Sequence, residues 1–160
     1  MEDKSYIRYL REMVGDSMVI LNAANTIIVN DKNEVLLQQR SEGGLWGLPG
    51  GLMELEDTIE SCAIREAKEE MGIDVRLTDF VGIFVNPMMR WRKNDRAKVI
   101  CYCFVAEIIG GSVAISDDES VAFGYFPKDS LPPIHAIDNL EAIHAYYANQ
   151  RSIIEGKSYR

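Results

Sequence analysis

The sequence contains few cysteines, and their spacing suggests neither a metal site nor a disulfide framework. Only three of the 160 residues are cysteine, and they do not have the spacing of zinc ligands. Cys101 and Cys103 alternate within an apolar run, so they point to the same face of an expected strand. We therefore interpret the thiols as buried and reduced, which favours a cytoplasmic protein.

The chain also lacks an excess of positive charge. Its 17 Lys and Arg residues are outnumbered by 25 Asp and Glu residues, which gives a formal net charge of −8. Such a charge disfavours non-specific binding to nucleic acid or to an anionic membrane. No apolar run approaches the length of a membrane span, and the N-terminus lacks the apolar core of a signal peptide. We therefore expect no membrane association and no stable nucleic-acid complex.

Length and composition are those of one globular domain. Apolar residues make up 47% of the chain and charged residues 26%, which is enough for a substantial core. We expect a single domain over residues 1–160, with an N-terminal arm at 1–16 and a flexible tail at 151–160. The arm packs either against the domain or against a second subunit, which leaves a homodimer open.

The pattern of apolar and turn-forming residues predicts strands mixed with two main helices. Runs rich in Val, Ile and Thr, bounded by Gly, Pro and Asn, indicate strands at 18–29, 34–40, 73–85, 97–109 and 121–126. Asn86-Pro87 is expected to end the third of these strands. Apolar residues at helical spacing predict helices at 57–71 and 138–150. This mixture predicts an α/β sandwich around a mixed sheet.

The stretch that carries the chemistry is a glycine pair followed by an acidic helix. Gly50 and Gly51 precede the first of the two helices. At about 100° per residue, Glu66, Glu69 and Glu70 fall within a sector roughly 100° wide beside the apolar face. Like charges at this spacing repel by roughly 0.2–0.5 kcal/mol per pair. An ordinary acidic surface is the alternative interpretation, but three carboxylates after a glycine loop favour a bound divalent cation, which prefers oxygen ligands.

At this stretch the sequence resembles the Nudix hydrolase family. The family's box reads Gly, five residues, Glu, seven residues, Arg-Glu, an aliphatic-type residue, any residue, Glu-Glu, any residue, Gly and another aliphatic-type residue. The matching residues are Gly51, Arg65, Glu66, Ala67, Glu69, Glu70, Gly72 and Ile73. The resemblance extends over roughly residues 18–150, and it implies a Nudix-type α/β/α sandwich around a mixed β-sheet.

The resemblance also implies a role for each of the site residues. Glu66, Glu69 and Glu70 correspond to the ligands of Mg²⁺, for which Mn²⁺ substitutes, and Glu66 and Glu70 belong to the catalytic centre. Arg65 corresponds to the arginine that holds those glutamates in place. In many members the general base is a glutamate on a distant loop, and Glu119 lies where that acid is expected. Glu119 is therefore the base or a further metal ligand, with an exposed acidic turn as the alternative.

The implied activity is hydrolysis of a diphosphate bond in a nucleoside diphosphate linked to another moiety. Nucleotide sugars, ADP-ribose, nucleoside triphosphates and dinucleoside polyphosphates all contain such a bond, and the box does not choose among them. The alternative is a catalytically silent Nudix domain that binds or senses a nucleotide. Such domains usually lose box glutamates, whereas Glu66, Glu69 and Glu70 are all present. We therefore expect an enzyme, a Nudix-type pyrophosphohydrolase.

One position departs from the family pattern. Asp57 stands where the family has Glu, three residues before Glu60. This arrangement is like a capping box, so Asp57 is expected to cap the helix. Arg65 is expected on the solvated side of the helix, where it pairs with Glu69 four residues later.

Residues expected to contact the substrate lie on both sides of the box helix. A phosphate can approach the Gly50-Gly51 backbone closely because no Cβ intervenes, and Arg40 ends the strand that leads into the box. The segment 84–98 carries five basic residues and one acidic residue. There we expect Trp91 to stack on a base while Arg92 holds phosphate, with a solvated hairpin tip as the alternative. Trp46 is expected to pack in the core.

Overall fold

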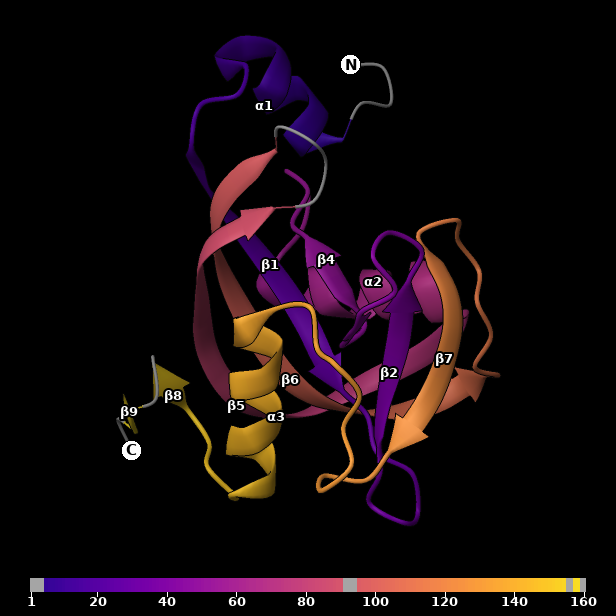
Figure 1. Cartoon of the computed structure of the whole chain (residues 1–160). Coiled ribbons are helices and arrows are strands. Elements are labelled where there is room, and N and C mark those ends of the chain that lie inside the picture. The colour runs from indigo at the N-terminus through magenta and orange to yellow at the C-terminus, as the bar shows by residue number, and fades with distance from the viewer. Residues whose placement is uncertain (1–4, 91–94, 155–156, 159–160) are drawn as a thin grey trace.

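The described part of the chain forms two β-sheets, and a helix covers each face of the larger one (Figure 1). The computed structural model describes residues 5–90, 95–154 and 157–158. The helices are α1 (Tyr6–Val14), α2 (Ile59–Met71) and α3 (Ile137–Tyr147). The strands are β1 (Val19–Ile27), β2 (Val35–Arg40), β3 (Trp46–Gly47), β4 (Gly50–Leu52), β5 (Ile73–Arg90), β6 (Arg96–Gly111), β7 (Ser120–Phe126), β8 (Ile153–Ile154) and β9 (Lys157–Ser158).

The larger sheet is mixed, as the sequence predicts. Among the described residues its strand order is β4-β1-β6-β5-β8-β9. Strand β1 runs parallel to β6, whereas β6 pairs with β5 in an antiparallel ladder. The smaller sheet has the order β3-β2-β7. A hydrogen bond from Leu36 N–H to the Ile28 carbonyl, at 2.8 Å, joins the two sheets.

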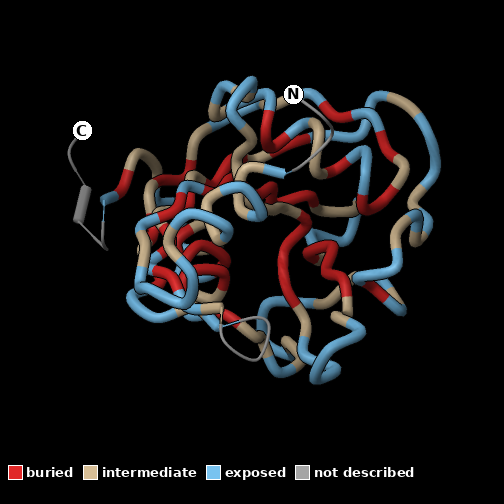
Figure 2. The backbone as a smooth tube through the Cα atoms, turned by 90° about the horizontal axis from the view of Figure 1, so that it is seen from above, coloured by how far each residue is buried: buried red, intermediate tan, exposed pale blue. Residues whose placement is uncertain are grey.

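Alternate side chains of β1 point to opposite faces of the larger sheet. Ala24 packs with Ala63 of α2, whereas Ile27 packs with Ile143 of α3. All four residues are buried. Figure 2 shows the buried segments, in red, mainly in the interior of the molecule. The period of two along the strand therefore places α2 on one face and α3 on the other, which confirms the predicted sandwich.

Strand β5 is longer than the sequence predicts. It continues through Pro87 to Arg90, whereas we expected Asn86-Pro87 to end it. The ladder to β6 changes register between Asn86 and Met89. Proline lacks the N–H that a regular ladder requires, and an irregularity of this kind accommodates it within a strand.

The C-terminal segment is not simply a free tail. We expected residues 151–160 to be flexible, but Ile153 is only 1% exposed and belongs to the core beside α3. Residues 153–154 form β8, which runs parallel to β5 at Gly82 and Ile83. An apolar side chain that fills the core explains why this part of the segment is held against the sheet.

The N-terminal arm is a helix that packs on the domain. Tyr6, Ile7 and Leu10 of α1 pack against a buried cluster that includes Leu21 and Val99. Pairing with a second subunit stays a prediction. Among the described residues, no helix combines the length and apolar character needed to cross a membrane.

Two smaller predictions concern single side chains of the core. All three cysteines are free and buried, as expected. Trp46 packs edge-on against Phe126, with ring centroids 4.8 Å apart. It joins the core cluster that contains α3 residues, so it is a packing residue as predicted, on the α3 side of the sheet.

Candidate active site

The acidic helix α2 begins with a capping box, one residue later than predicted. Thr58 is the N-cap, and its side-chain oxygen accepts a hydrogen bond from Ser61 N–H at 3.1 Å. The Ser61 hydroxyl in turn accepts from Thr58 N–H at 2.8 Å. The expectation that Asp57 caps the helix is therefore wrong, which leaves the Asp57 carboxylate for another partner. At the other end of α2, Gly72 adopts the left-handed conformation with φ of +68°, which favours glycine.

Glu70 is the most deeply buried of the three glutamates. The residue is 7% exposed, and its Oε2 accepts a hydrogen bond from Gly50 N–H at 2.8 Å. Gln38 on β2 also donates to this carboxylate. Burial raises the pKa of Glu70 well above its ordinary value, and the charge of Glu66 adds to that rise. Two donors hold the carboxylate, but they do not compensate for its burial.

Glu66 lies directly against the glycine loop. A Cβ added to Gly51 would come within 2.6 Å of the Glu66 carboxylate oxygens. Only glycine therefore allows the carboxylate and the loop backbone to approach this closely. Burial raises the pKa of Glu66 to about 7, against the lowering effect of Arg65 and with further increases from Glu69 and Glu119.

Arg65 clamps the acidic residues on both sides of the helix start. Its Nη2 and Nε donate to Asp57 Oδ2 and Oδ1 at 2.6 and 3.2 Å. Its Nη1 donates to Glu66 Oε1 at 2.9 Å and to Glu69 Oε2 at 3.0 Å. The predicted pair with Glu69 is present, but the side chain is only 27% exposed and bonds to Leu52 O as well. The prediction that Arg65 lies on the solvated side of the helix is therefore wrong.

The loop that follows β6 is tied to the C-terminal end of α2. Ser116 N–H donates to Glu70 O at 3.1 Å, and the Ser116 hydroxyl donates to Glu69 O at 2.6 Å. Further along this loop, the Glu119 carbonyl accepts from Ser41 N–H at 2.8 Å. The charge of Glu119 contributes to raising the pKa of Glu66. The loop is therefore held against the end of α2 that carries Glu69 and Glu70.

The other residues predicted to bind substrate are only partly described. Arg40 ends β2 and is half-buried, and its charge contributes to lowering the pKa of His135. Trp91 and Arg92 lie outside the described residues. Gln38, which sequence reasoning missed, links Glu70 to β7 because its Oε1 accepts from the Ser120 hydroxyl at 3.0 Å. A polar residue directly after the apolar run Val35–Leu37 is the signal that could have identified it.

The donor chemistry of the site fits a hard divalent cation. The carboxylates of Glu66 and Glu70 are buried or nearly so. The positive charge of Arg65 has to balance these two negative charges and that of Asp57 as well. Over residues 5–90, 95–154 and 157–158, no three acidic, histidine or cysteine side chains enclose a metal position as they stand. Arg65 contacts the carboxylates of Glu66 at 2.9 Å and Glu69 at 3.0 Å. Oxygen donors with excess negative charge are what Mg²⁺ and Mn²⁺ select.

The sequence model described as the NUDIX domain matches residues 20–147 of this chain. The chain belongs to the Nudix family. An ADP-ribose pyrophosphatase of Methanocaldococcus jannaschii is 31% identical over 122 residues, which cover 74% of this chain and 69% of that protein. A MutT-like protein of Streptomyces ambofaciens is 28% identical over 130 residues, which cover 79% of each. The resemblance found in the box is thus confirmed, and the chain is a Nudix pyrophosphohydrolase.

Solved structures agree with the Nudix fold. An ADP-ribose pyrophosphatase of Streptococcus suis superposes with a TM-score of 0.66 at 27% identity, over 84% of this chain and 95% of that one. A NUDIX hydrolase of Nitrosomonas europaea superposes with a TM-score of 0.69 over 88% of this chain and 97% of that one. At 18% identity the second match shows the fold alone.

Proposed function

We propose that this Nudix protein uses Mg²⁺ to hydrolyse the diphosphate bond of a nucleoside diphosphate linked to another moiety. One observation carries the proposal. A Cβ added to Gly51 would lie only 2.6 Å from the Glu66 carboxylate, and Glu70 accepts a hydrogen bond from Gly50 N–H at 2.8 Å. The acidic groups and a backbone open to phosphate therefore meet at one place.

The chain's own residues provide the anchor points for this reaction. Gly50 and Gly51 let phosphate oxygens come close to the backbone. Glu66, Glu69 and Glu70 would hold the cation through their carboxylate oxygens, and Arg65 fixes the arrangement of Glu66 and Glu69. When bound, Mg²⁺ would supply charge neutralisation of the diphosphate oxygens, orientation of the leaving group and a lower pKa for a water.

Glu119 is the residue that we propose as general base, with metal binding as its alternative role. Its charge acts on Glu66, and its loop is tied to α2 through Ser116. Glu119→Gln should lower kcat by roughly 100-fold or more, the usual range for a general base. The neighbouring exposed acid gives a matched control, because Asp118→Asn removes the same charge from the same loop. Equal kcat values for the two variants would remove Glu119 from the mechanism.

ADP-ribose is the first substrate to test. Two similar proteins, those of Methanocaldococcus jannaschii and Streptococcus suis, are ADP-ribose pyrophosphatases. We propose that Arg40 and the Gly50-Gly51 backbone contact the substrate, and that Trp91 and Arg92 contribute from the β5–β6 connection. Nucleotide sugars, nucleoside triphosphates and dinucleoside polyphosphates complete the panel.

The decisive experiment compares the wild-type protein with Glu70→Gln on this panel in the presence of Mg²⁺. Turnover of at least one compound, lost in Glu70→Gln, is the expected result. Calorimetric titration with Mn²⁺ should show binding that weakens sharply in Glu69→Gln and in Glu70→Gln. Nucleotide binding without turnover would instead indicate a sensor domain, and unchanged metal affinity would contradict the ligand assignment.

A further inference from the structure

We propose that Glu54 is a positioning residue through which the N-terminal helix α1 holds the Asp57–Arg65 pair, and with it the glutamates of α2, in place. The part played by those glutamates rests on the proposed function. Helix α1 lies before residue 20, where the NUDIX domain match begins. An element outside the matched domain is thereby connected to the acidic site.

The first connection joins Glu54 to the start of α1. Glu54 Oε2 accepts a hydrogen bond from Tyr6 N–H at 2.7 Å. The N-cap residue of α1, Ser5, makes no side-chain capping hydrogen bond. Glu54, distant in the sequence, therefore supplies the acceptor that the first turn of α1 lacks locally. The negative charge of its carboxylate also suits the positive end of the helix dipole.

The second connection joins Glu54 to the arginine clamp. Glu54 N–H donates to Asp57 Oδ2 at 2.9 Å. The same oxygen accepts from Arg65 Nη2 at 2.6 Å. Arg65 in turn bonds to Glu66 and Glu69. Hydrogen bonds thus connect the backbone of Tyr6 to two of the proposed metal ligands, through the side chain and the backbone N–H of Glu54, then Asp57 and Arg65.

Helix α1 is a firm anchor because both its apolar face and its C-terminal end are held. Its apolar face packs on the buried cluster that contains Leu21 and Val99. Near its end, Arg11 donates to Arg96 O at 2.7 Å and to Ser17 O at 2.7 Å. Arg11 also lies 3.0 Å from the carboxylate of Asp95. The position of Tyr6 N–H is therefore fixed by contacts that do not involve the acidic site.

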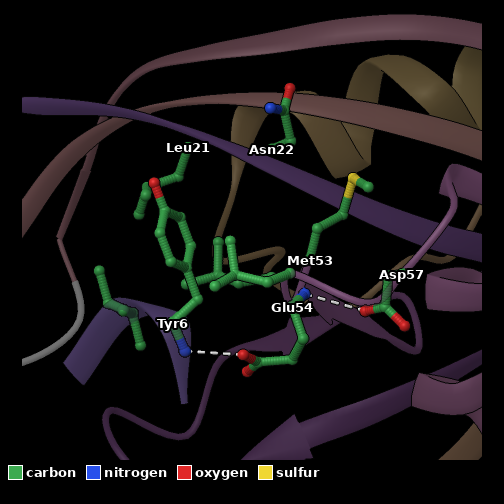
Figure 3. Close-up of a pocket in the computed structure, with 9 residues that line it drawn as sticks. Tyr6, Leu21, Asn22, Met53, Glu54 and Asp57 are labelled. Atoms are coloured by element: carbon green, nitrogen blue, oxygen red, sulfur yellow. Dashed lines mark hydrogen bonds between the residues drawn. The ribbon is translucent and has the colours of Figure 1, made fainter. Parts of the chain in front are cut away.

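A cavity of about 270 Å³ lies between α1 and the loop that carries Glu54. Figure 3 shows Tyr6, Glu54 and Asp57 on its wall, with the bonds Tyr6–Glu54 and Glu54–Asp57 drawn. Side chains do not fill the space between helix and loop at this point. Leu52 and Met53 of this loop pack against the neighbouring core clusters, whereas Glu54 is held by its hydrogen bonds to Tyr6 and Asp57.

The departure at residue 57 makes this loop position important. Aspartate is one methylene shorter than the glutamate of the family pattern. Its carboxylate reaches both Nε and Nη2 of Arg65 only if the loop backbone lies close to α2. The bond from α1 to Glu54 restrains the loop three residues before Asp57. Loosening that bond should therefore loosen the arginine clamp.

The test compares two variants that both lose the Tyr6 ring and differ in one N–H group. In Tyr6→Pro the donor to Glu54 is lost, whereas Tyr6→Ala loses the ring but keeps the donor. Proline is favoured at the first position of a helix. It also requires an extended residue before it, and Ser5 already has φ of −54° and ψ of 147°. The difference between the two variants therefore reports on the hydrogen bond.

Three measurements test the effect of losing the hydrogen bond between Tyr6 and Glu54. Relative to Tyr6→Ala, Tyr6→Pro should weaken Mn²⁺ binding and lower kcat, each by roughly tenfold, the lower end for residues that act through a metal ligand. KM for the nucleotide should change little. In the metal-free protein, the Glu54 amide should exchange its hydrogen faster in Tyr6→Pro. A purely structural role would change the unfolding temperature without these differences.

A second pair of variants addresses Glu54 itself. Glu54→Ala should show the same losses, whereas Glu56→Ala, an exposed acid in the same loop, should keep wild-type values. Combining Glu54→Ala with Tyr6→Pro should add nothing to Glu54→Ala with Tyr6→Ala, because the bond is already absent. Equal Mn²⁺ affinity and equal amide exchange in Tyr6→Pro and Tyr6→Ala would overturn the proposal. Failure of the wild-type protein to turn over any diphosphate compound would instead overturn the proposed function.

Discussion

Asp57 and Arg65 form a two-point ion pair, with Oδ2 to Nη2 at 2.6 Å and Oδ1 to Nε at 3.2 Å. The side chain of Asp57 is only 9% exposed, so solvent screens the pair less than it screens a surface pair. The hydrogen bond from Arg65 lowers the pKa of Asp57, and the Asp57 carboxylate raises the pKa of Arg65. The one departure from the Nudix pattern therefore keeps the arginine clamp intact.

The first prediction concerns this pair. Asp57→Asn should lower the free energy of unfolding by about 1.5–3 kcal/mol, the value of hydrogen bonds to charged groups. It should also weaken Mn²⁺ binding, because Arg65 is then free to shift away from Glu66. Urea denaturation and calorimetric titration measure the two effects. Asp57→Glu restores the family residue and should keep most of the metal affinity. Equal losses in both variants would show that the charge at this position is not what matters.

The second prediction concerns the start of α2. Thr58→Ala should lower the free energy of unfolding by about 1 kcal/mol, because Ser61 N–H loses its acceptor. Glu60→Gln, in the same exposed turn but outside the capping box, should stay within about 0.5 kcal/mol of the wild type. Urea denaturation compares the two variants. A larger loss of stability in Glu60→Gln than in Thr58→Ala would show that Thr58 is not the N-cap.

The third prediction concerns the cysteines. Burial raises the pKa of Cys62 to about 12 and raises the pKa values of Cys101 and Cys103 well above the ordinary range. Since the thiolate is the reactive form, iodoacetamide at pH 8 should leave the native protein unlabelled while urea-unfolded protein reacts at all three sites. Mass spectrometry counts the adducts. Labelling of Cys62 at equal rates in both states would contradict its burial.

The fourth prediction concerns pH. Burial lowers the pKa of His135 from 6.5 to about 4. The unfolded state therefore takes up a proton below pH 6.5 that the folded state does not bind, so stability falls as the pH drops through this window. Between pH 7 and pH 5 the wild type should lose about 1–2 kcal/mol more than His135→Gln. Urea denaturation at both pH values gives the comparison, and His144→Gln, at an exposed position, is the matched control.

If wild type and His135→Gln lose the same stability on acidification, His135 is not desolvated in the folded protein. The close contact with Gly47, whose added Cβ would lie 2.7 Å from the His135 ring, would then not keep water from the imidazole.

Most of the fold could be predicted from the sequence because its local signals are strong. Runs rich in Val, Ile and Thr indicate the strands, β1 and β6 among them, and Gly72 marks the end of α2. The passage of β5 through Pro87 could not be predicted, because a register change against β6 absorbs the missing N–H. The core position of Ile153 depends likewise on contacts with β5 and α3, which are distant in the sequence.

The residues of the candidate site likewise differ in whether the sequence alone could identify them. Helical spacing grouped Glu66, Glu69 and Glu70 on one face, whereas the role of Arg65 came from the resemblance to the Nudix box, and helical spacing placed its side chain wrongly. The roles of the three glutamates as metal ligands stay predictions. Gln38 and Glu54 were missed, because they reach the site from β2 and from the loop before α2. Trp91 and Arg92 lie outside the described residues, so their substrate role stays a prediction.

The sequence by itself determined the family and the acidic helix, since the Nudix box depends on spacing within one continuous segment. Only the tertiary structure decided which partner each charged group has. Asp57 pairs with Arg65 instead of capping α2, and Glu54 connects that pair to Tyr6 of α1. The physical reason is that hydrogen bonds and burial depend on distance in space, and residues 6, 54 and 65 are brought together only when the chain folds.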